Sequence, residues 1–158
     1  MKIHIGSAVG KGSTKLAAFD DALLKMGAAN YNILRLSSII PAEAEIVVHT
    51  DQVPKLGGKW GDKIYAVYAE LRTDTHNDEV WAGIGWCRNL ETNEGMFVEH
   101  HGRNEETVRN DIIDTLTDMK QNRGIETTDI EMQVVGGKAD SKATCAIVIA
   151  AYQTEGWK

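Results

Sequence analysis

The sequence predicts a single α+β domain spanning residues 1–158, in which two helices cover two stacked and mainly antiparallel β-sheets. Two segments carry apolar residues at helical spacing, and roughly seven or eight short segments show the alternation typical of strands. Most strand segments are joined by connections that are too short for a helical crossover, which favours antiparallel pairing. Seven or eight strands and two amphipathic helices can bury their apolar faces by forming two packed sheets with a helix on each outer face.

The first third of the chain predicts one helix between short strands. Residues 14–26 carry a helical apolar stripe, with Thr14 as a suitable N-cap and Gly27 as a stop signal. A glycine-rich loop is expected before this helix, and a second loop over residues 51–62 contains Pro54 and several glycines. The strand segments predicted here span residues 2–9, 31–36 and 46–49.

The rest of the chain is rich in predicted strands and contains one long helix. Residues 105–122 carry an apolar stripe, with Asn104 as the N-cap and Gly124 as the end. Residues 146–151 are apolar on both faces, which predicts a strand in the centre of its sheet. The strand segments predicted here span residues 63–72, 80–88, 95–101, 130–135 and 144–152.

The composition is that of an ordinary globular protein, with 42% hydrophobic and 25% charged residues. The net charge of −6 argues against nucleic-acid and anionic-membrane partners, because both attract clustered Lys and Arg. No apolar run approaches a membrane span and no secretory signal pattern is seen, so we expect a cytoplasmic protein that does not enter a membrane. Cys87 and Cys145 lie in apolar surroundings and are expected to be buried free thiols.

Two adjacent serines, Ser37 and Ser38, follow a predicted strand and precede Pro41. Such a pair can cut its own backbone when the Ser38 hydroxyl attacks the Ser37 carbonyl carbon and the amide becomes an ester. β-Elimination then leaves dehydroalanine at position 38, and loss of ammonia turns it into a pyruvoyl group. The pyruvoyl carbonyl acts as an electron sink, the role otherwise taken by pyridoxal phosphate. Serine pairs also occur in ordinary turns and caps, so the pair alone leaves both interpretations open.

Other polar residues form weaker candidates. Glu99 follows an apolar run, so it is either a solvent-exposed edge carboxylate, the commoner case, or a partly buried proton donor with a raised pKa. His100 and His101 point to opposite faces of a strand, so no metal site is expected there. Asp20 borders the apolar face of the first helix, where it is either solvated or placed to bind a cation. Asn32 is unexpected inside a strand.

The glycine-rich segment before the first helix imitates a phosphate-binding loop without matching it. Only three residues separate Gly6 from Gly10, and Gly12 follows Lys11 where a serine or threonine is required. A flexible loop leading into a helix is the simpler interpretation.

The segment around the serine pair resembles the family of pyruvoyl-dependent arginine decarboxylases. The similarity is strongest in the runs LAAFDDALL, NILRLSSIIP and EAEIV, at residues 16–24, 32–41 and 43–47. It continues more weakly to the C-terminus through a Met-x-x-Glu motif that ends at Glu99 and a small-residue strand over residues 145–152. The sequence departs from the family at Ala42, where many members have a second proline, and in the loops over residues 6–13 and 51–62.

The resemblance implies an αββα sandwich that assembles as a homotrimer with active sites between neighbouring subunits. It implies cleavage into a β chain of residues 1–37 and an α chain of residues 38–158. The α chain would begin with a covalent pyruvoyl group made from Ser38, and Ser37 would end the β chain.

The resemblance also implies roles for three side chains and a reaction. Asn32 would assist cleavage, Glu99 would return a proton to the substrate, and Asp20 would bind the substrate guanidinium. The reaction would convert L-arginine to agmatine and carbon dioxide with no pyridoxal phosphate and no metal. Agmatine would then feed polyamine synthesis or help to consume protons under acid stress.

The sequence leaves three rival interpretations. One is a decarboxylase with the same cofactor that acts on another amino acid. Another is an unprocessed, non-catalytic homologue that serves as a binding or regulatory subunit. The third is a nucleotide-binding module that uses Lys11.

Overall fold

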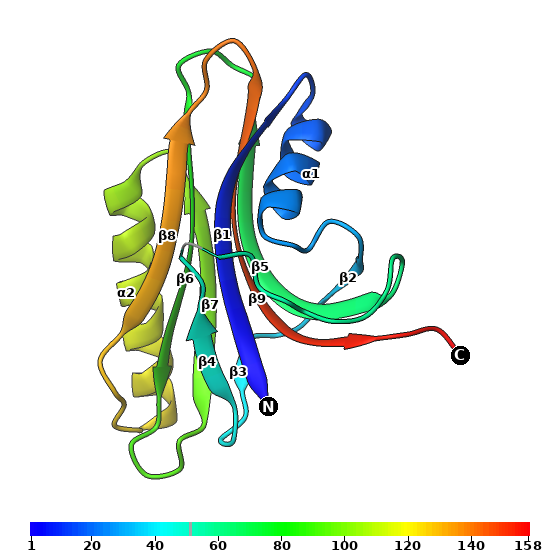
Figure 1. The fold of residues 1–158 in the computed structure, drawn as a ribbon. Coiled ribbons are helices and arrows are strands. Elements are labelled where there is room, and N and C mark those ends of the chain that lie inside the picture. The colour runs from blue at the N-terminus through cyan, green and yellow to red at the C-terminus, as the bar shows by residue number, and fades with distance from the viewer. Residues whose placement is uncertain (51) are drawn as a thin grey trace.

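The computed structural model describes residues 1–50 and 52–158 as a four-layer αββα sandwich (Figure 1). Helix α1 (Lys15–Lys25) covers the outer face of one sheet, and helix α2 (Glu105–Arg123) covers the outer face of the other. The predicted α+β class is therefore confirmed. Asp51, the first residue of the loop predicted over residues 51–62, lies outside the described residues.

The sheet beneath α1 has five strands in the order β2-β5-β9-β1-β4. Its bounds are β1 (Lys2–Gly12), β2 (Asn32–Arg35), β4 (Glu45–Val48), β5 (Lys63–Thr73) and β9 (Ala143–Glu155). The three long inner strands pair antiparallel, whereas the short edge strands β2 and β4 pair parallel with their neighbours. Strand β9 lies in the centre, as its apolar sequence predicts.

The sheet beneath α2 has four strands in the order β3-β7-β6-β8, all paired antiparallel. Its bounds are β3 (Ile39–Ile40), β6 (Glu79–Arg88), β7 (Gly95–Gly102) and β8 (Glu131–Lys138). Strand β3 has only two residues, too few to show a period, and no strand was predicted there.

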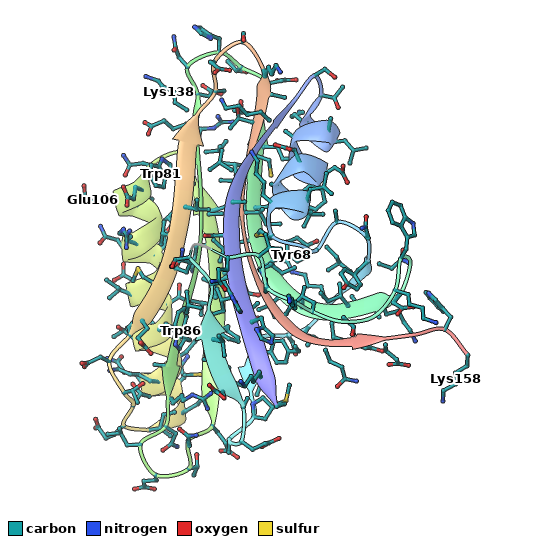
Figure 2. All side chains as sticks on the ribbon, in the orientation of Figure 1. Tyr68, Trp81, Trp86, Glu106, Lys138 and Lys158 are labelled. Atoms are coloured by element: carbon teal, nitrogen blue, oxygen red, sulfur yellow. The ribbon has the colours of Figure 1, made fainter. Side chains whose placement is uncertain are left out.

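Three apolar layers hold the elements together. The largest lies between the two sheets, and smaller ones lie beneath each helix. Figure 2 marks one aromatic residue in each layer: Trp86 packs between the sheets, Trp81 faces α2 and Tyr68 faces α1. The intersheet layer includes Ile3, Ile5, Val67, Ile84, Phe97 and Val148.

Local signals at both helix ends are confirmed. The Thr14 side chain accepts a hydrogen bond from the Ala17 amide, and Asn104 accepts one from Thr107. Gly124 closes α2 in the left-handed conformation, with a φ of 62°. These caps depend only on neighbouring residues, which is why the sequence locates the helices well.

Both cysteines are buried and unpaired, as predicted. Burial and the charge of Glu70 raise the pKa of the Cys145 thiol to about 12, so this thiol stays protonated at neutral pH. Among the described residues, neither helix has the length and apolar character required to cross a bilayer.

The glycine-rich segment is not a loop, and that prediction is wrong. Strand β1 continues to Gly12, and α1 packs directly on its glycines. A Cβ at Gly10 would overlap the Ala18 carbonyl oxygen and the Ala22 amide nitrogen. The glycines therefore serve close packing of helix on strand, which is a second physical reason for glycine besides turn formation.

We expect Gly10→Ala to destabilise the protein by about 1–3 kcal/mol, because α1 must move away from β1 to make room for the methyl group. Thermal unfolding followed by circular dichroism measures the effect. Gly137→Ala is the matched control, since its Cβ would lie 3.4 Å from the nearest atom, a side-chain carbon of Val9. Equal melting temperatures for the two variants would contradict this account of Gly10.

Candidate active site

The two serines lie where the chain crosses from one sheet to the other. Strand β2 belongs to the five-stranded sheet. Strand β3, which begins after three intervening residues, belongs to the four-stranded sheet (Figure 1). The Leu36 amide donates a hydrogen bond to the Ala66 carbonyl at 2.9 Å, and the Phe97 amide donates one to the Ser38 carbonyl at 2.8 Å. The bond between the serines is thus flanked by segments that are anchored to different sheets.

Ser38 has an unfavourable backbone conformation. Its φ is 74°, in the left-handed region that costs a residue with a Cβ about 1–2 kcal/mol. Such strain persists only where surrounding contacts enforce it, and it concentrates at functional sites. The preceding residue, Ser37, is exposed, so water reaches this part of the chain.

The side chain of Ser38 contacts Glu99, and the structure thereby joins two of the predicted site residues. The Ser38 hydroxyl donates a hydrogen bond to Glu99 Oε1 at 2.6 Å. Glu99 lies on β7 opposite Ile84 and is half-buried. Its partial burial agrees with the second alternative, a partly buried carboxyl, and not with the solvent-exposed edge carboxylate. A carboxylate at this distance can take the proton of the attacking hydroxyl.

Tyr152 is a site residue that the sequence did not identify. Its hydroxyl donates a hydrogen bond to the Ile39 carbonyl at 2.8 Å, and its ring packs edge-on against Phe97 with centroids 6.1 Å apart. Burial raises the pKa of Tyr152, and the charge of Glu99 raises it further. A tyrosine at the end of an apolar strand was the available signal, because a half-buried phenol needs a polar partner.

Asp20 and Asn32 occupy a different part of the molecule. Both line an open pocket of about 690 Å³ between α1, β2 and β5, together with the aromatic rings of Phe19, Tyr31 and Tyr68. Asp20 is exposed, and the Asn32 side chain donates a hydrogen bond to the Gly61 carbonyl at 2.7 Å. The pocket combines a carboxylate with aromatic faces, the chemistry that binds an organic cation.

The pocket and the serine site are not joined within one chain. Among the described residues, no hydrogen bond or ion pair links Asp20 or Asn32 to Ser37, Ser38 or Glu99. Ser38 is the sixth residue after Asn32, which corresponds to at most roughly 20 Å of extended chain. The five predicted residues therefore form two groups.

The remaining sequence candidates have other contacts. Lys11 lies within β1, where its side chain pairs with Asp140 at 3.2 Å and its amide donates to Asp21. This segment has no loop that could cradle a phosphate, so the nucleotide-binding interpretation loses its structural basis. His100 pairs with the Thr115 hydroxyl at 2.8 Å. Within residues 1–50 and 52–158, no three His, Cys, Asp or Glu side chains gather in a metal-binding arrangement.

The residues around position 38 fit the formation of a pyruvoyl group. The attacking hydroxyl has a carboxylate partner, the backbone is strained at the same residue, and the segments on both sides are held by hydrogen bonds. Cleavage would release the strain without detaching either end from its sheet.

Comparison with known proteins identifies a family for this chain. A family model described as pyruvoyl-dependent arginine decarboxylase matches residues 2–156. Relatives with that name include one from Halobacterium salinarum, 32% identical over 96% of this chain and 93% of its own length. Another, from Methanothermobacter thermautotrophicus, is 31% identical over 80% of each chain.

A relative of the same name from Thermococcus kodakarensis is 36% identical, and the alignment spans 64% of this chain and 61% of that protein. The family model covers both groups of site residues and both sheets. The chain therefore belongs to the pyruvoyl-dependent arginine decarboxylase family.

Proposed function

We propose that this protein cuts itself between Ser37 and Ser38 and then converts L-arginine to agmatine and carbon dioxide. The observation that carries the proposal is the 2.6 Å hydrogen bond from the Ser38 hydroxyl to Glu99, at a residue with a left-handed backbone. A hydroxyl beside a carboxylate and next to a strained peptide bond is arranged for attack on that bond. Family membership supports arginine as the substrate.

The cleavage proceeds through an ester. The Ser38 oxygen bonds to the Ser37 carbonyl carbon as the C–N bond between the two residues breaks, and the hydroxyl proton passes to the freed nitrogen. Loss of the Cα proton of residue 38 then breaks its Cβ–O bond. The products are a carboxyl end at Ser37 and dehydroalanine at position 38. Addition of one water and release of one ammonia convert dehydroalanine to the pyruvoyl group.

In the decarboxylation, the pyruvoyl group supplies the carbonyl that accepts electrons as carbon dioxide leaves. Glu99, whose carboxyl already lies within hydrogen-bond distance of residue 38, holds the proton that returns to the substrate α-carbon. Asp20 provides a carboxylate that can bind a guanidinium through two parallel hydrogen bonds, which favours arginine over lysine.

A homotrimer explains why one chain carries two separate groups of site residues. Ser37, Asp20 and Asn32 are all exposed in the single chain. Packing of the Asp20 pocket of one subunit against the Ser38 site of its neighbour would place guanidinium recognition opposite the pyruvoyl carbonyl. Sedimentation of the purified protein tests this assembly.

An intact-mass spectrum of the denatured protein tests the proposed function directly. We expect two fragments, residues 1–37 and 38–158, with the larger one lighter by one ammonia than simple hydrolysis predicts. Incubation of the same sample with L-arginine should yield agmatine and carbon dioxide. A single full-length mass that persists on incubation, with no turnover, would overturn the proposal.

Substitution of Asp20 tests substrate recognition. We expect Asp20→Asn to raise the KM for L-arginine by about 10- to 100-fold, because a hydrogen bond to a charged group contributes about 1.5–3 kcal/mol. Steady-state kinetics on the cleaved enzyme measures this effect.

The neighbouring carboxylate provides a matched control. Asp21 accepts a hydrogen bond from the Lys11 amide at 2.9 Å and pairs with Lys25 at 3.0 Å, so it fixes α1. Asp21→Asn should lower the melting temperature and leave the KM nearly unchanged. An unchanged KM in Asp20→Asn would indicate another substrate or another guanidinium site.

A further inference from the structure

Tyr152 connects the two sheets at the point where the serine pair crosses between them. The residue lies on β9 of the five-stranded sheet, yet its hydroxyl donates to the Ile39 carbonyl on β3 of the four-stranded sheet at 2.8 Å. Its ring also contacts Phe97 of β7, with an angle of 73° between the ring planes. One side chain therefore joins the segment that follows Ser38 to both sheets.

The carbonyl groups of two consecutive residues, Ser38 and Ile39, are each held by a hydrogen bond from another strand. The Ser38 carbonyl accepts a hydrogen bond from the Phe97 amide, and the Ile39 carbonyl accepts one from Tyr152. Rotation of either peptide plane would break one of these two hydrogen bonds. The backbone after Ser38 is thus kept from relaxing, which maintains the φ of 74° at Ser38.

We propose that Tyr152 is a positioning residue for chain cleavage: its hydroxyl fixes the Ile39 carbonyl and thereby keeps Ser38 strained with its own hydroxyl against Glu99. This inference rests on the proposed self-cleavage. Tyr152 acts through the backbone, and its hydroxyl need not contact the bond that breaks.

The surroundings of Tyr152 keep its hydroxyl protonated, so that it remains a hydrogen-bond donor. Burial and the charge of Glu99 both raise its pKa, so the phenol stays protonated throughout the neutral range and keeps donating to Ile39. The edge-on contact with Phe97 fixes the ring without using the hydroxyl. Removal of the oxygen alone should therefore leave the ring packing in place.

The test follows cleavage of Tyr152→Phe after cell-free synthesis with labelled methionine. Both fragments carry the label, since Met1 and Met26 precede the serine pair and three methionines follow it. We expect Tyr152→Phe to cleave about tenfold more slowly than the unmodified chain, the change that corresponds to loss of one oriented hydrogen bond.

Two controls separate positioning from general stability. Tyr65→Phe removes a hydroxyl that donates a hydrogen bond to Glu155 at 2.7 Å, within the sheet that also contains Tyr152. This variant should cleave at the normal rate. Val67→Ala removes two methyl groups from the intersheet core and should lower the melting temperature without slowing cleavage tenfold.

The outcomes are distinct. Slow cleavage in Tyr152→Phe alone supports the inference. Normal cleavage in Tyr152→Phe overturns the inference and leaves self-cleavage intact. Equally slow cleavage in Val67→Ala overturns it as well, because stability would then set the rate. If the unmodified chain never cleaves, the proposed function fails and the inference fails with it.

Discussion

Ser38→Ala should leave the protein in one piece and without decarboxylase activity. Alanine lacks the hydroxyl that attacks the Ser37 carbonyl, so neither the ester nor the pyruvoyl group can form. The backbone strain stays, because alanine and serine pay a similar cost at a φ of 74°. We expect a single full-length mass and a loss of turnover to the assay background, the largest effect predicted for any single change.

Ser37→Ala is the matched control for this experiment. It removes an exposed hydroxyl from the adjacent residue and keeps both the carbonyl that is attacked and the Ser38 nucleophile. This variant should cleave and show activity. Cleavage in Ser38→Ala would mean that another group cuts the chain. Loss of cleavage in Ser37→Ala but not in Ser38→Ala would mean that Ser37, not Ser38, is the attacking residue.

Glu99→Gln should cut turnover of the cleaved enzyme by about 10²- to 10⁴-fold, the usual contribution of a positioned proton donor. The glutamine oxygen still accepts the hydrogen bond from Ser38 but cannot take its proton, so we expect the chain to cleave more slowly than the unmodified chain and to reach the cleaved form on longer incubation. Turnover is measured per cleaved chain, with the cleaved fraction taken from intact mass. This normalisation separates an effect on decarboxylation from an effect on cofactor formation.

Glu91→Gln controls for the loss of one negative charge. Glu91 is exposed in the turn before β7, and no described contact involves its carboxylate. This variant should match the unmodified enzyme in both cleavage and turnover. Normal turnover in a fully cleaved Glu99→Gln enzyme would remove Glu99 from the proton-transfer role.

The sequence by itself determined the features that depend on neighbouring residues. Thr14 and Asn104 cap their helices through contacts three residues away, and Gly124 ends α2 by adopting a left-handed backbone. The apolar run at residues 146–151 placed β9 in the centre of its sheet because both of its faces are buried. The Ser37–Ser38 pair likewise indicated its chemistry, since nucleophile and target are adjacent.

The sequence was misleading where contacts with distant segments determine the local structure. Gly10 suggested a loop because glycine is common in turns, yet it lies in a strand where α1 leaves no room for a Cβ. Strand β3 has two residues and exists only because β7 pairs with it. Neither feature has a local signal, because the partner is far away along the chain.

Only the tertiary structure decided how the site is assembled. It brought Glu99 to Ser38 across 61 residues and Tyr152 to Ile39 across 113, while it left Asp20 and Asn32 in a separate pocket. It also imposed the strained backbone of Ser38, since the chain there must pass from one sheet to the other under hydrogen bonds on both sides. Chemical identity is local to a residue, whereas distance, burial and strain come from the packing of two sheets.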